Sequence, residues 1–96
     1  MKKLSIIVPC YNEEESVPLF YPAVNKVMDT IPDLEPEYWF INDGSKDNTL
    51  KEIKELRKKD PEHIHFVSFS RNFGKESALY AGLQAATGDY VVVMDV

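Results

Sequence analysis

Four short stretches of the chain are apolar at nearly every position, at about residues 3–8, 38–41, 64–69 and 90–94. A short, continuously apolar run is typical of a β-strand that is covered on both faces. The segments between these runs carry apolar residues three or four positions apart, which is the spacing of an amphipathic helix. The pattern therefore predicts an α/β fold in which three strand–helix units and a last strand form an open parallel sheet with right-handed crossovers.

The first predicted helix has a good apolar stripe, formed by Val17, Phe20, Tyr21, Val24, Val27, Met28 and Ile31. Pro18 suits a first helical turn, whereas Pro22 cannot donate a bond to the preceding turn. We therefore expect a bend or a late start at Pro22. Pro32 and Pro36 are expected to mark the loop into the second strand.

The second helix is predicted to take Ser45 as its N-cap, with Asp47 in its first turn. Its buried stripe consists of Leu50, Ile53 and Leu56, and Asp60-Pro61 ends it. The third helix should begin near Gly74 and pack closely on the sheet, because small residues lie along one face. Gly88 is expected to end it in a left-handed cap.

Composition narrows the classes of protein. With 96 residues, 44% apolar and 28% charged, the chain is expected to form one packed domain, residues 1–96. The net charge of −5 disfavours nucleic acid as a partner. The single cysteine, Cys10, is expected to be buried and fits a reducing compartment. A cytoplasmic location is therefore expected. No apolar run reaches the length of a membrane span.

Polar residues follow each predicted strand, at 9–15, 42–47, 70–75 and Asp95. In an open parallel sheet, ligands bind beyond the carboxyl ends of the strands. The four segments therefore predict one shared site. The glycine-rich phosphate loops of common nucleotide-binding folds are absent, so a carboxylate-held metal ion is the expected partner for any phosphate.

Individual residues of this site leave alternatives open. Asp95 could ligate a metal or simply end a strand, and Asp43 could bind a nucleoside or close an Asx-type turn. Tyr11 could stack on a base or pack on the core. Glu13 could bind a ribose or base edge, or could place a favourable charge in a first helical turn. Arg71 and Lys75 could bind phosphate, or each could form an ion pair with one of the surplus acidic residues.

Taken together, residues 8–14, 41–49, 70–76 and 81–83 carry a resemblance to family-2 glycosyltransferases. Within that family, the chain resembles polyprenyl-phosphate sugar transferases, above all bactoprenol glucosyltransferases, with dolichyl-phosphate mannosyltransferases as more distant relatives. The resemblance implies a Rossmann-like three-layer α/β/α sandwich with strand order 3-2-1-4, the nucleotide-binding half of a GT-A fold. It also implies inverting sugar transfer, with glucose favoured, from a nucleotide-sugar to a polyprenyl phosphate at the cytoplasmic face of a membrane.

The same resemblance assigns roles to residues. The nucleotide-sugar contacts would be Pro9, Tyr11, Glu13, Ile41, Asp43 and Asp95. Asp95 would be the first acid of the family's D-x-D motif, binding Mg²⁺ or Mn²⁺, and no catalytic base is assigned. A UDP-sugar is the favoured donor and a GDP-sugar the alternative. The second acid would lie two residues beyond Asp95, so we expect a truncated nucleotide-binding half-domain that is inactive alone. Because its last strand, residues 90–94, would be an unpaired apolar edge, we also expect a dimer through that strand or through the apolar surface next to it.

Two rival classes and one variant of the main hypothesis remain. A receiver-like binding module would place an acid pair directly after the first strand, where this chain has Pro9-Cys10-Tyr11. A nucleotidyltransferase would need a basic, glycine-rich loop there, whereas this chain has Glu13-Glu14-Glu15. A family-2 transferase that uses a sugar hydroxyl as acceptor would require a catalytic Asp or Glu.

Overall fold

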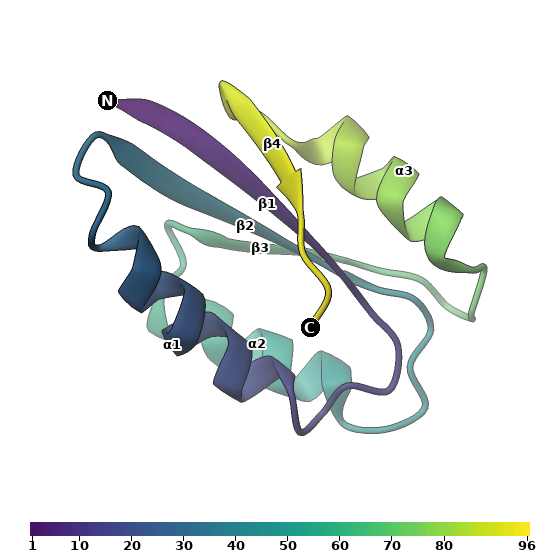
Figure 1. Cartoon of the computed structure of the whole chain (residues 1–96). Helices are drawn as coiled ribbons and strands as arrows, with labels where there is room; N and C mark the ends of the chain where they lie inside the picture. The colour runs from purple at the N-terminus through teal and green to yellow at the C-terminus, as the bar shows by residue number, and fades with distance from the viewer.

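The computed structural model describes all residues, 1–96, as one four-stranded parallel sheet with three helices (Figure 1). In chain order the elements are β1 (Lys2–Cys10), α1 (Val17–Met28), β2 (Leu34–Asn42), α2 (Thr49–Lys59), β3 (Ile64–Ser68), α3 (Lys75–Ala85) and β4 (Tyr90–Val93). The strands lie in the order β3-β2-β1-β4. This confirms the predicted α/β class and strand order.

The sheet is covered on both faces, as its continuously apolar strands require. Helices α1 and α2 lie on one face and α3 on the other (Figure 1). The larger core, on the α1 and α2 face, is built around Ile6, Val8, Tyr38, Phe40 and Ile64. The smaller core contains Ile7, Ile41 and Ala78. Neighbouring residues of β1 thus enter different cores, because side chains alternate along a strand.

A late helix start at Pro22 and a loop at Pro36, both considered from the sequence, are wrong. Helix α1 begins at Val17 and runs through Pro22, so the helix has no late start. Pro36 lies within β2, paired with Leu4, and not in a loop. It is tolerated there because β3 pairs with β2 only from Tyr38 onward, which leaves this part of β2 with one neighbouring strand.

The predicted start of α3 near Gly74 and end of α2 at Asp60 are confirmed, but the predicted caps Ser45 and Gly88 are wrong. Helix α2 begins at Thr49 after the cap residue Asn48, because Ser45 is engaged elsewhere: its hydroxyl accepts a bond from the Asn12 N–H at 2.9 Å. Helix α3 ends at Ala85, and Gly88 does not adopt a left-handed conformation. Gly88 is needed for space instead, since a Cβ atom would lie 2.6 Å from the Ser5 Oγ.

Strand β4 lies at an edge of the sheet, and β1 is its only neighbour. Tyr90 is 54% exposed, Val91 45% and Val93 44%, so the apolar character of this strand is not matched by burial. None of the helices combines the length and the apolar content that crossing a membrane requires.

Candidate functional site

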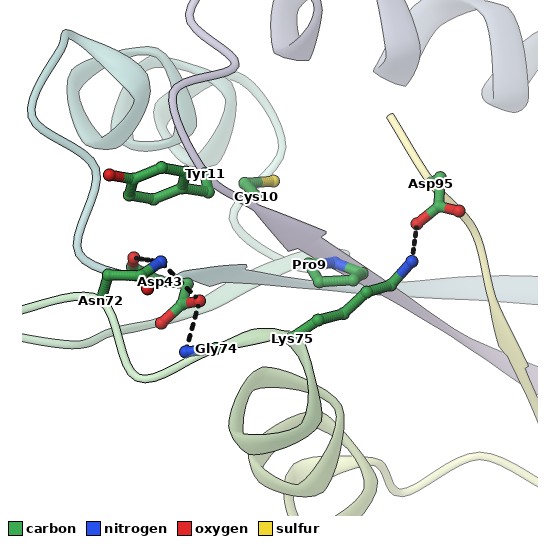
Figure 2. A pocket seen from close by; sticks show the side chains of 8 residues that line it. All are labelled: Pro9, Cys10, Tyr11, Asp43, Asn72, Gly74, Lys75 and Asp95. Atoms are coloured by element: carbon green, nitrogen blue, oxygen red, sulfur yellow. Dashed lines mark hydrogen bonds and ion pairs between the residues drawn. The ribbon is translucent and has the colours of Figure 1, made fainter.

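A pocket of about 400 Å³ lies where the four strand ends meet (Figure 2). It is lined by Pro9, Cys10, Tyr11, Asp43, Asn72, Gly74, Lys75 and Asp95. These residues come from the end of β1, from the loops that follow β1, β2, β3 and β4, and, for Lys75, from the first position of α3. The predicted meeting of the four polar segments at one place is therefore confirmed.

Asp43 holds one wall of the pocket together. Its carboxylate accepts bonds from the Phe73 N–H at 2.7 Å, the Gly74 N–H at 3.0 Å and the Asn72 Nδ2 at 3.0 Å. The residue is only 4% exposed. The carboxylate that follows β2 thus fixes the loop between β3 and α3, and one of its roughly four acceptor positions has no protein donor.

The turn that carries Asp43 depends on its neighbours. The Asn42 Oδ1 accepts a bond from the Ser45 N–H at 3.2 Å, so the side chain that caps this turn is Asn42 and not Asp43, for which an Asx-type turn had been considered. Gly44 has φ +66°, and a Cβ atom there would lie 2.1 Å from the backbone carbon of Arg71. Only glycine allows this close approach between the two loops.

The opposite wall is the loop after β1. Asn12 has φ 55°, a conformation that asparagine tolerates better than most residues. Its Oδ1 accepts a bond from the Lys46 N–H at 2.9 Å, which ties this loop to the loop after β2. Tyr11 is 43% exposed and lies across the pocket from Asp43 (Figure 2). An aromatic face is therefore available to a planar ligand group.

At the other end of the pocket, Lys75 and Asp95 form an ion pair with an Nζ to Oδ1 distance of 2.9 Å (Figure 2). Both side chains are largely exposed, so the pair adds little stability. Just before Asp95, the Met94 N–H donates to the Ile7 carbonyl at 3.0 Å, which attaches the segment to β1.

Three predicted site residues do not line this pocket. Ile41 is completely buried in the core beside α3. Glu13 lines a separate polar hollow of about 310 Å³ beside Asp47. The Arg71 guanidinium lies 4.8 Å from the centre of the Phe73 ring. Ile41 lies within strand β2 and faces the core, whereas Glu13 and Arg71 lie on loops outside the set of lining residues. Their proposed contacts with a nucleotide-sugar remain predictions.

Sequence reasoning missed Cys10, Asn72 and Gly74 as lining residues. Asn72 and Gly74 gave a weak signal, since both follow the more conspicuous Arg71 and line the pocket because Asp43 binds their loop. Cys10 was correctly predicted to be buried. Burial, and then the charge of Glu13, raise the pKa of the Cys10 thiol to about 12.

No three His, Cys, Asp or Glu side chains are grouped to hold a metal ion. Asp95 nevertheless offers one exposed carboxylate beside the pocket. Mg²⁺ is commonly held by one or two carboxylates together with phosphate oxygens and water. The Asp95 carboxylate thus fits a hard divalent ion whose remaining ligands would come from a bound diphosphate and water.

The chain is similar to solved structures over almost its whole length. A mannosyltransferase from Pyrobaculum calidifontis, determined in complex with GDP-Man and Mn²⁺, is 26% identical with a TM-score of 0.70, over 98% of this chain and 27% of that one. TarS 1-349 from S. aureus is 25% identical with a TM-score of 0.78, over 99% and 27%. These likenesses confirm the predicted GT-A type of fold.

Curated relatives are similar over almost the whole chain. It is 50% identical to the bactoprenol glucosyl transferase of Shigella phage SfV and 49% identical to a prophage homolog from Escherichia coli K12. Each match covers 98% of this chain and 30% of the relative. The chain therefore spans about 30% of the length of these relatives. The family model "Glycosyl transferase family 2" matches residues 5–96, so the chain belongs to glycosyl transferase family 2.

Proposed function

We propose that residues 1–96 are the donor-binding half of a longer glycosyltransferase that moves a sugar, with glucose favoured, from a nucleotide-sugar to a polyprenyl phosphate with inversion. The observation that carries this proposal is the pocket at the four strand ends, in a chain about half identical to bactoprenol glucosyl transferases. We favour a UDP-sugar as donor, with a GDP-sugar as the alternative. Residues 1–96 alone are expected to transfer no sugar.

The pocket offers a place for each part of a nucleoside diphosphate. The exposed ring of Tyr11 can stack on the base. The free acceptor position of Asp43 can take an N–H or hydroxyl group of the nucleoside. Lys75 can bind a phosphate oxygen, and Asp95 can hold Mg²⁺ or Mn²⁺ against the diphosphate. When bound, such an ion stabilises the charge that develops on the departing diphosphate.

Lys75 and Asp95 support this assignment through their pairing. Without a donor, each neutralises the other across 2.9 Å at the pocket. An exposed pair of this kind separates at little cost. A diphosphate with its cation would then give Lys75 an anion and Asp95 a cation, so the arriving ligand replaces one ion pair by two.

The acceptor side follows from chemistry. A polyprenyl phosphate is already anionic near neutral pH, so its oxygen can attack the anomeric carbon without a strong general base. No residue of the pocket is therefore assigned as a catalytic base. We propose that the reaction occurs at the cytoplasmic face of a membrane, since the lone Cys10 fits a reducing compartment.

We also propose that residues 1–96 form a homodimer through β4. This edge strand pairs on one side only and presents Tyr90, Val91 and Val93 partly exposed, and unpaired strand edges associate with other chains. Light scattering over a concentration series is expected to show a dimer. A monomer at the highest concentrations would contradict the proposal.

Two variants test the site, with UDP binding measured by calorimetry in the presence and absence of Mn²⁺. Asp43→Ala should weaken binding in both conditions, whereas Asp95→Ala should abolish only the effect of Mn²⁺. Asp33→Asn removes an exposed acid far from the pocket and serves as the control. If both pocket variants bind UDP like the parent chain, the site assignment is wrong.

A further inference from the structure

Glu37 is a buried carboxylate that the proposed chemistry does not use. It lies in β2 near the amino ends of the strands, away from the pocket, and is only 5% exposed. Its Oε1 accepts bonds from the Ser5 hydroxyl at 2.8 Å, the Trp39 Nε1 at 2.8 Å and the Thr87 N–H at 3.0 Å. Its Oε2 accepts a bond from the Thr87 hydroxyl. A buried carboxylate that accepts four hydrogen bonds holds the groups that donate them in fixed positions.

Those bonds converge on the turn that leads into β4. Thr87 belongs to this turn, and Ser5 extends the network because its Oγ accepts a bond from the Gly88 N–H at 2.8 Å. The Asp89 N–H then donates to the Lys3 carbonyl at 2.8 Å. In the sheet, Ser5 pairs with Glu37 on one side and with Val91 on the other. The network therefore fastens the start of β4 to β1.

Outside this network, β4 is held by its backbone pairing with β1, by the contact of Val92 with the larger core, and by the Asp89 carboxylate, which accepts a bond from the Lys3 N–H at 2.9 Å. The strand has four residues, only one neighbouring strand, and side chains that are mostly exposed. Registers of such strands are weakly specified, and a slip of one residue turns every side chain to the other face. After β4, one bond from the Met94 N–H to the Ile7 carbonyl precedes Asp95. Where Asp95 stands therefore depends on the register set at Thr87–Asp89.

We propose that Glu37 is a positioning residue: by anchoring the Thr87–Gly88 turn through Ser5, it sets the register of β4 on β1 and thereby places Asp95 at the pocket. The part of this inference that concerns Asp95 as a metal ligand rests on the proposed function. The part that concerns the register of β4 does not.

The network suggests variants that separate anchoring from overall stability. Glu37→Gln keeps one oxygen for the three donors on Oε1, and its amide group can donate to the Thr87 hydroxyl. Glu37→Leu leaves these donors without an acceptor, and Thr87→Val is a milder change that removes one bond. Ile53→Val, in the core on the other face, is the control that lowers stability without touching the network.

Hydrogen exchange tests the register directly. The Met94 N–H reports the bond to β1 beyond β4, and the Asp43 N–H, which donates to the Cys10 carbonyl at 2.9 Å, reports β1 and β2. Glu37→Leu and Thr87→Val should speed exchange of Met94 about tenfold or more relative to Asp43. Glu37→Gln should stay near the parent, and Ile53→Val should shift both amides alike. If Met94 and Asp43 also shift together in Glu37→Leu and Thr87→Val, the proposal is overturned.

Calorimetry with UDP tests the consequence for Asp95. In Glu37→Leu and Thr87→Val, the gain in affinity from Mn²⁺ should be lost, while affinity without Mn²⁺ should stay within about twofold of the parent. Glu37→Gln should restore the gain. A gain that persists while Met94 is deprotected refutes the positioning of Asp95. If the parent itself shows no gain, the proposed function fails, and the exchange result still decides the role of Glu37 in the register.

Discussion

Replacing Asp43 should both loosen the β3–α3 loop and lower the stability of the whole domain. Asp43→Ala leaves the Phe73 N–H, the Gly74 N–H and the Asn72 amide without their acceptor. Asp43→Asn is the conservative counterpart. Its single oxygen can keep the bond to Phe73, but its amide group then faces the donors of Gly74 and Asn72.

The size of the loss follows from these three bonds. A hydrogen bond to a charged group contributes about 1.5–3 kcal/mol when its partners are buried. Asn72 and Phe73 are exposed in this structure, so water can replace part of what is lost. We therefore expect about 2–4 kcal/mol for Asp43→Ala and about half of that for Asp43→Asn. For a domain of 96 residues, whose stability is expected to be about 5–14 kcal/mol, this is a large fraction.

Urea unfolding followed by the fluorescence of Trp39, the only tryptophan, measures both losses. Asp33→Asn removes one exposed carboxylate and should change the free energy of unfolding by no more than about 0.5 kcal/mol. If Asp43→Ala costs no more than this control, Asp43 does not hold the loop, and the account of this wall of the pocket is wrong.

Three further predictions concern other parts of the molecule. Gly44→Ala combines a φ of +66° with a contact of 2.1 Å and should cost at least about 2 kcal/mol in urea unfolding. Hydrogen bonds to Asp60 and Glu35 raise the pKa of His63 in the folded state. The contribution of His63 to the free energy of unfolding is therefore complete below the unfolded pKa of about 6.5 and is lost as the pH rises through the folded pKa. His63→Gln should therefore flatten that part of the pH–stability curve, and an unchanged slope would disprove the role. Iodoacetamide should alkylate Cys10 far more slowly in native protein than in urea, because the thiol is buried and its pKa is raised to about 12; equal rates would contradict this.

The sequence predicted the sheet well because burial on both faces leaves continuous apolar runs, and chain order plus right-handed crossovers then restricts the topology. It predicted the helix ends poorly. Ser45 looks like an N-cap, but its hydroxyl accepts a bond from Asn12, more than thirty residues away in the chain. Gly88 looks like a left-handed cap, but packing against Ser5 decides its role. Both errors arise from contacts between distant segments, which local patterns do not contain.

For the candidate site too, the sequence predicts the general location but not the contacts between distant loops. That the four strand ends meet could be predicted from the direction of the strands alone. How Asp43 draws Asn72 and Gly74 into the wall could not, because those bonds join loops thirty residues apart. Glu37 escaped notice entirely, since a single acid beside Pro36 resembles a loop residue until β2 is known to extend to Leu34.

Calorimetric titration of residues 1–96 with UDP and with GDP, each with and without Mn²⁺, tests the central claim that the pocket at the four strand ends binds a nucleoside diphosphate through Asp95 and a metal ion. We predict that a nucleoside diphosphate binds, UDP more tightly than GDP, and that Mn²⁺ strengthens the binding. Binding of Mn²⁺ alone with no response to either nucleotide, or nucleotide binding that Mn²⁺ leaves unchanged, would contradict the claim.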